Sequence, residues 1–481
     1  MSFRTPCLFG TRAFELVRRS LLQAPGLPFG DALSAERMQA AFDAEGVSFG
    51  EREEDSDGVV YTPAITLWAL LSQMLFTGEQ RSCRAAVIRV AAYLALLGRE
   101  ISATNTGAYC RARAKIPARV VQRLTQQVAA ECETAVPQKW RWHGRTVKLA
   151  DGTTISLADT PENQAAYPQS TAQVPGLGFP ILRAVALTSL ATGMITAAAY
   201  GPYAGKETGE IALLRSLFDN LASGDVLLGD RFYCGWFLLA LLQEQGVDFV
   251  VRLHQRRRAD FRTGARLGKG DHLVLWDKPQ RPAWLDPETY AALPEYLVIR
   301  EVRVTVNVPG FRSESLVVVT SLFDETEIPR DDLAALYRRR WLAELHLRAI
   351  KTTMQLDVLR CKTPEMVHQE LWAGFLAYNL IRQSILQSAL ASDQRPEHLS
   401  FTGTMQFLAS TWLVAAVTPP PADAATDPLI ALRLNHGSSH LVGNRPNRIE
   451  PRALKRRPKP HKLLTLPRAE ARAKLVAKRA A

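Results

Sequence analysis

Cysteine is scarce in this chain, with six among 481 residues, and no two of them form a CxxC pair. The nine histidines also lack the spacing of a metal site, so the sequence excludes a zinc ribbon and a disulfide-stapled scaffold. We expect reduced thiols in a cytoplasmic protein. No GxxxxGK[ST] stretch is present, which argues against a P-loop accessory protein driven by nucleotide hydrolysis.

Long apolar runs are absent as well. The two most apolar stretches are ITLWALLSQMLF and VIRVAAYLALLG, and both are shorter than the roughly 20 residues that a membrane-spanning helix needs. The first residues of the chain lack the continuous apolar stretch of a signal peptide. With 47% hydrophobic and 22% charged residues, the composition is that of a globular protein. We therefore expect no membrane association.

Acidic residues are outnumbered by basic ones, 47 against 59, which gives a net charge of +12. Most of the excess lies in residues 445–479, which contain 13 Lys or Arg and 2 Asp or Glu, a net charge of +11. A balance this basic predicts a polyanionic partner, with nucleic acid as the first candidate. This tail, with KRRPKPHK at its centre, is interrupted by proline and is predicted to be extended or disordered.

The chain is long enough for several domains, and its patterns predict a multidomain α/β protein. Residues 1–140 have helical apolar spacing, and we interpret them as a DNA-binding helical domain instead of a plain bundle with a charged face. Residues 141–253 alternate between strand-like and helical segments, which predicts a mixed sheet flanked by helices. Residues 254–325 are rich in strand-like segments and predict a β insertion. The α/β domain resumes in residues 326–395 with two long helices, and residues 396–481 contain a further helix and the basic tail.

Two aspartates accompany strand-like segments of the α/β domain. Asp151 lies within RTVKLADGTTISLAD, where a turn aspartate before Gly152 is the alternative interpretation. Asp230 directly follows the apolar segment VLLG, at the predicted carboxyl end of a strand, where α/β sheets place ligand-binding groups. A helix N-cap, or a structural pair with Arg231, would explain Asp230 equally well. Neither aspartate is decisive alone.

A third acid, Glu344, lies in the strongly basic stretch YRRRWLAELHLRAIK. On a helix that turns about 100° per residue, the side chains of Tyr337, Arg340, Glu344 and Lys351 fall within about 60° of one another. Solvated i,i+4 pairing explains Arg340 and Glu344, but it leaves the tyrosine and the three consecutive arginines unexplained. Together Asp151, Asp230 and Glu344 could hold two Mg²⁺ or Mn²⁺ ions, the arrangement used for in-line phosphoryl transfer.

The spacing Tyr337-x2-Arg340-x3-Glu344-x6-Lys351 resembles the Tyr-Arg-Glu-Lys signature of bacterial insertion-sequence transposases of the DDE type, in the insertion-sequence-four family. LADGTTISLADTPEN is similar to the first-Asp region of that family, and VLLGDRFYCGW is similar to its second-Asp region. The tail NRPNRIEPRALKRRPKPHKLLTLPRAEAR is similar to the C-terminal ends of such proteins. The resemblance extends from about residue 60 to the end. It implies a ribonuclease-H-like catalytic core interrupted by a β-rich insertion.

The resemblance also implies a function. The protein would bind the inverted-repeat ends of an insertion sequence and would catalyse metal-dependent DNA cleavage and strand transfer. The catalytic and metal-binding triad would be Asp151, Asp230 and Glu344. The partners would be the transposon ends and target DNA, with a homodimer in the synaptic complex. The protein would act in the bacterial cytoplasm, associated with the nucleoid.

Candidate DNA contacts follow from the same resemblance. Tyr337, Arg340 and Lys351 would contact the phosphates of the transposon ends. Trp341, beside the signature arginine, is a candidate for packing or for DNA contact. Separately from the resemblance, the run Arg256, Arg257 and Arg258, at the start of the β insertion, is either a solvated charged loop or a phosphate-backbone contact.

Two other functions stay open on the sequence. A non-catalytic DNA-binding protein derived from a transposase would have lost one of the acids, and all three are present here. A nuclease with a ribonuclease-H-like fold would need the same acids, but it would need neither the Tyr-Arg-Glu-Lys face nor specific binding to DNA ends.

Overall fold

The computed structural model describes six ranges of the chain: residues 35–47, 60–98, 104–305, 315–417, 427–442 and 463–480. The predictions for the first 34 residues, for Cys7 and for the KRRPKPHK stretch lie outside these ranges. Within the ranges, none of the helices combines the length and the apolar character that crossing a bilayer requires. All cysteines there are free thiols.

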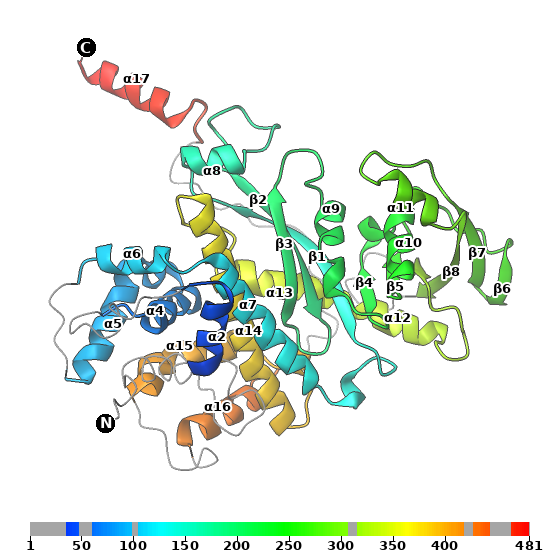
Figure 1. The fold of residues 1–481 in the computed structure, drawn as a ribbon, viewed down its shortest axis with the longest axis horizontal. Helices are drawn as coiled ribbons and strands as arrows, with labels where there is room; N and C mark the ends of the chain where they lie inside the picture. Colours follow the sequence, from blue (N-terminus) through cyan, green and yellow to red (C-terminus); the bar gives the residue numbers. More distant parts are fainter. Residues whose placement is uncertain are drawn as a thin grey trace, which may run out of the picture.

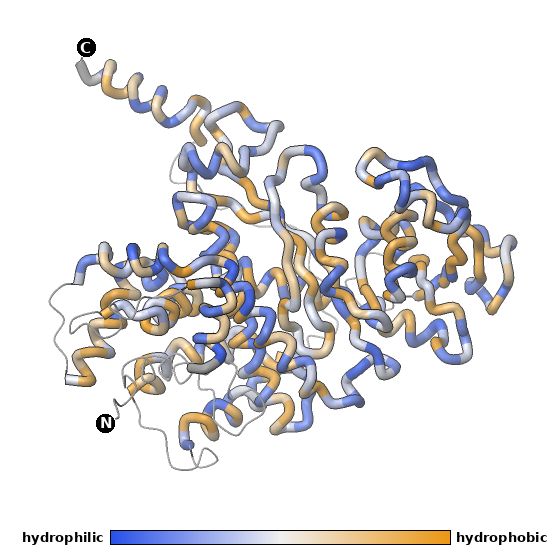
Figure 2. The backbone as a smooth tube through the Cα atoms, in the orientation of Figure 1, coloured by the Kyte–Doolittle hydropathy of each residue, from blue (hydrophilic) through white to orange (hydrophobic). Residues whose placement is uncertain are grey.

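Helices from both ends of the chain form one helical body (Figure 1). Its members are α2 (Ala35–Ala44), α4 (Pro63–Leu75), α5 (Cys83–Leu96), α6 (Gly107–Ala114), α7 (Ala118–Thr134), α14 (Pro364–Ala391), α15 (Phe401–Val417) and α16 (Pro428–Ser439). The hydroxyl of Thr62 caps α4 by accepting a hydrogen bond from Ile65 N at 3.3 Å, and α4 is buried along its whole length. The ring of Trp68 in α4 packs on that of Trp412 in α15, with centroids 5.2 Å apart. One apolar core therefore joins segments that are far apart in sequence (Figure 2).

Buried arginines tie the N-terminal helices to α14. Arg113 is 6% exposed, and its Nε donates to Gln369 Oε1 at 2.8 Å. Arg81 is 2% exposed, and its Nη2 lies 3.1 Å from Glu370 Oε1. A buried charge needs such partners, and Arg81 has an ion pair whereas Arg113 has a hydrogen bond to the neutral Gln369. These two basic residues of the N-terminal segment thus hold the helical body together and are not available to DNA.

A nine-stranded mixed sheet lies beside the helical body, with strand order β3-β2-β1-β4-β5-β9-β8-β7-β6. Its first five strands are β1 (Val147–Ser156), β2 (Ile181–Ser189), β3 (Ile195–Pro202), β4 (Val226–Gly229) and β5 (Asp248–Arg252). β1, β2 and β3 form an antiparallel meander, whereas β4 pairs in parallel with β1, and β5 in parallel with β4. Short β4 is fully buried, as expected for a parallel strand covered on both faces.

The segment predicted to be a β insertion extends this same sheet. Its elements are β6 (Ala265–Gly268), β7 (Asp271–Asp277), α11 (Pro287–Ala292), β8 (Tyr296–Thr305) and β9 (Ser315–Thr320). β9 pairs antiparallel with β5, so the ladder of backbone hydrogen bonds continues from the first five strands into the insertion. The insertion therefore shares its backbone framework with the rest of the sheet.

Two helical layers cover the faces of the central strands (Figure 1). The helices concerned are α9 (Glu210–Arg215), α10 (Trp236–Glu244), α12 (Arg330–Arg339) and α13 (Trp341–Arg348). Ala150 of β1 packs in the cluster under α9 and α10, whereas Val147 and Leu149 pack in the cluster under α12 and α13. Because successive side chains of a strand point to opposite faces, Asp151 belongs to the face of Val147 and Leu149. The short helix α8 (Pro161–Ala166) follows β1.

The first of the two long helices predicted in residues 326–395 is interrupted twice. α12 ends at Arg339, and α13 begins at Trp341, with Arg340 between them at φ −51° and ψ −31°. A π-helical turn, Ala349–Thr353, follows α13, and such turns are frequent at functional sites. The prediction of one continuous helix is therefore wrong, and a uniform step of 100° per residue does not hold along the signature.

The prediction of an extended or disordered tail is wrong for its last part. Residues 468–480 form helix α17 (Arg468–Ala480), which projects away from the helical body (Figure 1). This segment contains no proline and is rich in Ala, Arg and Lys, which are strong helix formers. The proline-rich character that motivated the prediction belongs to the residues before it.

Candidate active site

Strand pairing brings the two predicted aspartates together. In the parallel pair of β1 and β4, Leu149 lies opposite Leu228. Two residues further along both strands, the same register sets Asp151 beside Asp230. Asp151 lies inside β1 and not in a turn, and its Oδ1 accepts a hydrogen bond from Gly152 N at 3.0 Å. The alternative of a turn aspartate is therefore wrong.

Asp230 is the first residue after β4 and also caps the 3-10 turn that follows it. Its Oδ1 accepts a hydrogen bond from Phe232 N at 2.7 Å. The N-cap interpretation and the ligand interpretation are compatible, because the bond occupies one lone pair of a carboxylate that has several. The cap fixes the carboxyl group at the end of the strand.

Glu344 enters from α13, which packs against β1. Arg340 Nη2 donates to Glu344 Oε1 at 2.5 Å, so the i,i+4 pair that the sequence allowed is present. The Arg340 side chain is 16% exposed and that of Glu344 is 41% exposed. The Glu344 side chain is therefore the more exposed of the two, and the Arg340 side chain is the more buried.

The charges of Asp230 and Glu344 act on Asp151. Burial raises the pKa of Asp151 to about 6, the nearby Arg340 and the Gly152 amide oppose this shift, and the charges of Asp230 and Glu344 add to it. Arg340 is therefore close to both Asp151 and Glu344. Ionising Asp151 in the folded protein therefore costs more free energy than ionising a solvent-exposed aspartate. A cation bound beside the carboxylate would offset this cost.

Asp151→Asn is expected to stabilise the metal-free protein near pH 7, by on the order of 1–3 kcal/mol. A carboxyl whose folded-state pKa of about 6 exceeds its ordinary value of 3.8 loses stability as it ionises. The gain should therefore be absent below about pH 4, grow up to about pH 6 and stay constant above. Thermal unfolding of both proteins in EDTA from about pH 5 to pH 8 measures it. A gain of equal size at both ends of that range would contradict the assignment.

The donor set suits a divalent cation, since three carboxylates supply the hard oxygen ligands that Mg²⁺ and Mn²⁺ prefer. Within the described ranges, however, no three His, Cys, Asp or Glu side chains converge on one point. Glu344 is engaged by Arg340 instead. To share a cation with Asp151 and Asp230, its carboxylate must leave that ion pair.

The other signature residues lie around the acids. Tyr337 is 6% exposed and packs in the core beneath α12, where burial raises its pKa to about 12 against the effect of Arg340. Its ring is part of the core, so at most its hydroxyl could meet DNA. Lys351 Nζ donates to the Thr154 carbonyl of β1 at 2.9 Å, three residues from Asp151. Arg340 thus acts on the aspartate directly, whereas Lys351 is held further along the same strand.

The remaining predicted DNA contacts lie on the surface. The Trp341 side chain is 44% exposed at the start of α13. Arg256, Arg257 and Arg258 are exposed in the loop after β5, and the Arg257 guanidinium lies 3.9 Å from the ring centroid of Trp276. Their role in DNA binding stays a prediction.

Two further polar residues lie near the acids, and no motif in the sequence marks them. Glu210 opens α9, and a Cβ built on Gly152 would lie only 2.7 Å from its Oε2, so the carboxylate lies directly over the glycine. Burial raises the pKa of Glu210, with Arg183 opposing and Asp230 adding to the shift. Tyr233 is 1% exposed, and burial together with the charges of Glu210 and both aspartates holds its pKa well above the ordinary value. An acid in the first turn of a helix is common, so the sequence offers no signal for Glu210.

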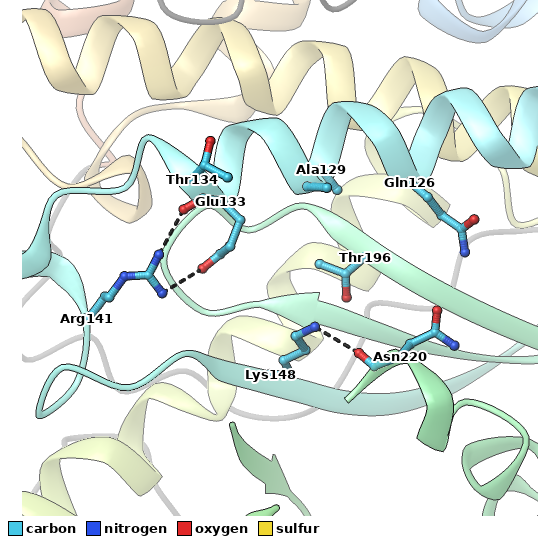
Figure 3. Close-up of a pocket in the computed structure, with 9 residues that line it drawn as sticks. Gln126, Ala129, Glu133, Thr134, Arg141, Lys148, Thr196 and Asn220 are labelled. Atoms are coloured by element: carbon cyan, nitrogen blue, oxygen red, sulfur yellow. Dashed lines mark hydrogen bonds and ion pairs between the residues drawn. The ribbon is translucent and has the colours of Figure 1, made fainter. Parts of the chain in front are cut away.

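A cavity of 510 Å³ lies elsewhere, between α7 and the sheet (Figure 3). Around it Arg141 Nη2 donates to the Glu133 carbonyl at 3.0 Å, and Lys148 Nζ donates to the Asn220 carbonyl at 2.9 Å. Lys148 precedes Asp151 by three residues in β1, so the two side chains point to opposite faces. None of the three acids lines this cavity, and it is therefore separate from the candidate active site.

Comparison with known proteins identifies a family and two relatives. Residues 142–380 match the family described as the transposase DDE domain. Transposase InsG for insertion sequence element IS4, from Escherichia coli strain K12, is 33% identical over 303 residues, covering 61% of this chain and 64% of that protein. Putative transposase InsZ from the same strain is 27% identical over 142 residues, covering 29% of this chain and 46% of that protein. The chain thus spans less than two thirds of the length of these relatives.

One solved structure aligns over most of the chain. It is a cryo-EM structure of the piggyBac transposase synaptic complex with hairpin DNA. The alignment covers 89% of this chain and 85% of the piggyBac chain. The identity is 9% and the TM-score is 0.40, a similarity too low to support a conclusion about this protein.

Proposed function

Because the chain belongs to the transposase DDE family, we propose that it is a DNA transposase of an insertion sequence, which cleaves the inverted-repeat ends and transfers them to target DNA. The observation that supports this most directly is the parallel register of β1 and β4, which sets Asp151 beside Asp230 under the helix that bears Glu344. Three carboxylates in this arrangement are suited to metal-assisted phosphoryl transfer.

The proposal includes a domain organisation. The antiparallel meander followed by two parallel strands supports a ribonuclease-H-like core, formed by residues 141–253 and 326–395 and interrupted by residues 254–325. Residues 1–140 would contribute to DNA binding, together with the basic tail in residues 396–481. Two copies would act in a synaptic complex with both ends, in the bacterial cytoplasm and associated with the nucleoid.

Two Mg²⁺ or Mn²⁺ ions, held by Asp151, Asp230 and Glu344, would supply an activated hydroxyl nucleophile and charge stabilisation at the reacting phosphate. The chain's own residues prepare the site for this chemistry. Backbone amides hold both aspartates in place, at 3.0 Å for Asp151 and 2.7 Å for Asp230. Arg340 holds Glu344 until a DNA phosphate competes for its guanidinium, since Arg binds phosphate through the same paired donors as carboxylate. Phosphate binding by Arg340 would thus free Glu344 for the metal.

The direct test uses labelled duplexes that carry candidate ends, found as short inverted repeats flanking the coding sequence. Incubation with Mg²⁺ is expected to give a nick with a 3′-hydroxyl at the end of the element, and EDTA should abolish it. A nuclease would cut unrelated structured duplexes equally well. A non-catalytic DNA-binding protein would bind the ends without nicking them, and either result would overturn the proposal.

Arg340→Ala is expected to weaken end binding and to reduce the slope of log affinity against log salt by about 0.9, the loss of one phosphate contact. Arg339→Ala is the matched control, because Arg339 forms a similar ion pair, with Glu397 at 2.6 Å, but directs it to the helical body. Fluorescence anisotropy between about 50 and 200 mM salt measures both slopes. A slope left unchanged by Arg340→Ala would count against a phosphate contact.

A further inference from the structure

Both ends of the loop that joins β5 to β6 are fixed by one buried carboxylate. Glu301 of β8 is 5% exposed, and its Oε1 accepts a hydrogen bond from Nε1 of Trp276 at 3.2 Å. His272 of β7 bridges the second oxygen, at 3.2 Å, to the carbonyl of Thr263, at 2.8 Å, where the loop ends. At the start of the loop, the Arg257 guanidinium lies 3.9 Å from the ring centroid of Trp276. The Glu301 carboxylate therefore links the two ends of the loop through Trp276 and His272.

Two of the four arginines in this loop already have partners. Besides Arg257, Arg262 donates to both carboxylate oxygens of Asp260 at 2.8 Å. Arg256 and Arg258 are exposed, and in the described part of the chain neither an ion pair nor a side-chain hydrogen bond engages them. Their charges are therefore available to an anion from solution.

The loop starts at the sheet edge where the two aspartates of the candidate site lie. β5 runs parallel to β4, and Val251 lies opposite Gly229, the residue before Asp230. From β5 the chain crosses to the outer strands, since β9 and β8 lie between β5 and β7 in the sheet. A polyanion that is bound at the aspartates and extends towards the inserted strands would meet Arg256 and Arg258.

We propose that this loop is a preformed binding surface for the phosphate backbone of DNA, contacted by Arg256 and Arg258. Arg257 is a positioning residue, which acts through the other two and does not touch DNA. A loop already held in its bound conformation pays less entropy on binding. A buried ion pair contributes little to stability, so the Glu301 network is better explained by the geometry that it imposes on the loop. This inference rests on the proposed function for the identity of the partner.

The salt dependence of DNA affinity tests the surface. Each phosphate contact contributes about 0.9 to the slope of log affinity against log salt for duplex DNA. The double variant Arg256→Ala/Arg258→Ala is therefore expected to reduce the slope by about 1.8. Fluorescence anisotropy on the full chain measures it, with a candidate end and with an unrelated duplex of equal length. Both duplexes should show the same loss, because phosphate contacts carry no sequence information.

Arg257→Ala separates anchoring from direct contact. In the wild-type background it is expected to reduce the slope, because the loop loses its contact with Trp276. Added to the double variant, it is expected to have no further effect, since the two residues that it positions are already gone. Either an unchanged slope in the first background or a further reduction of about 0.9 in the second would exclude a positioning role for Arg257.

Arg262→Ala is the matched control, because it removes an exposed arginine of the same loop whose charge Asp260 balances. It is expected to leave the slope unchanged. A loss as large as that of one phosphate contact would mean that affinity follows the net charge of the loop, which contradicts the assignment to Arg256 and Arg258. All the substituted arginines are exposed, and thermal unfolding shows that each variant is folded.

The outcomes separate this inference from the proposed function. If the ends are nicked in the presence of Mg²⁺ but the double variant keeps the wild-type slope, the transposase function stands and the loop surface is ruled out. If the slope falls as expected on both duplexes but no end is nicked, the loop binds DNA and the proposed function fails instead. A wild-type chain that binds neither duplex would overturn both.

Discussion

Glu344→Gln is expected to slow divalent-dependent nicking of the transposon ends by about a thousandfold while end binding stays nearly intact. The amide keeps the size of the side chain but lacks the charge that holds a cation, and metal assistance is worth several kcal/mol, at about 1.4 kcal/mol per factor of ten. Single-turnover nicking on labelled ends measures the rate, and anisotropy on the same duplex measures binding.

Asp331→Asn is the control for this prediction. Asp331 lies in the first turn of α12, and its side chain is 91% exposed, so its loss should leave nicking unchanged. A nicking rate equal to that of the wild type in Glu344→Gln would exclude Glu344 as a metal ligand. Parallel loss of nicking and binding would instead indicate a defect in folding or in DNA recognition.

Asp271→Ala is expected to lower the free energy of unfolding by about 3–5 kcal/mol, because it leaves a buried arginine without its counter-charge. Arg300 is fully buried, and its Nε and Nη2 donate to Asp271 at 3.0 and 2.7 Å. Its Nη1 donates to the carbonyls of Leu322 and Ile328 at 3.1 and 2.9 Å. The pair thus fixes the inserted strands to the segment that leads into α12. Urea unfolding followed by circular dichroism measures the loss.

The same insertion provides an exposed counterpart. Arg262 donates to both carboxylate oxygens of Asp260 at 2.8 Å, but this pair lies in solvent. Exposed ion pairs contribute little because water screens them, so Asp260→Ala should leave the unfolding curve almost unchanged. An equal decrease in the free energy of unfolding in Asp271→Ala and Asp260→Ala would show that the burial of Arg300 does not make its ion pair more important for stability.

Local patterns predicted most of the central elements. The segment around Asp151 and the short apolar run before Asp230, both predicted to be strands, are strands in the structure. Their apolar periods and the glycines between them were sufficient signals. The contact between Trp68 and Trp412 could not be predicted in this way, because apolar periodicity tells which face is buried and not which distant segment covers it. The helix interruption at Arg340 could not be predicted either, because the residues around it are good helix formers.

Some features of the candidate site could be predicted from the sequence, and others could not. The spacing of Tyr337, Arg340, Glu344 and Lys351 led to the resemblance, and the family match confirms it. The pairing of Arg340 with Glu344 was an alternative that the sequence allowed, and it is present. The position of Asp151 beside Asp230 depends on the register between two strands, which no single segment encodes. Glu210 depends on how α9 packs over Gly152, and so it lay beyond any motif.

The two outer strands of the long sheet, β3 and β6, bear on how copies of this chain could assemble. Unpaired edges invite strand addition from another molecule, and proteins limit this hazard by covering an edge or keeping it short and charged. α7 packs against β3, which ends at Pro202, and β6 spans only Ala265–Gly268 and includes the exposed Arg266. Neither edge strand therefore favours pairing with a strand of another molecule. If two copies meet on DNA, as proposed, they would therefore associate through helices and loops, and no shared strand pairing would have to break when they separate.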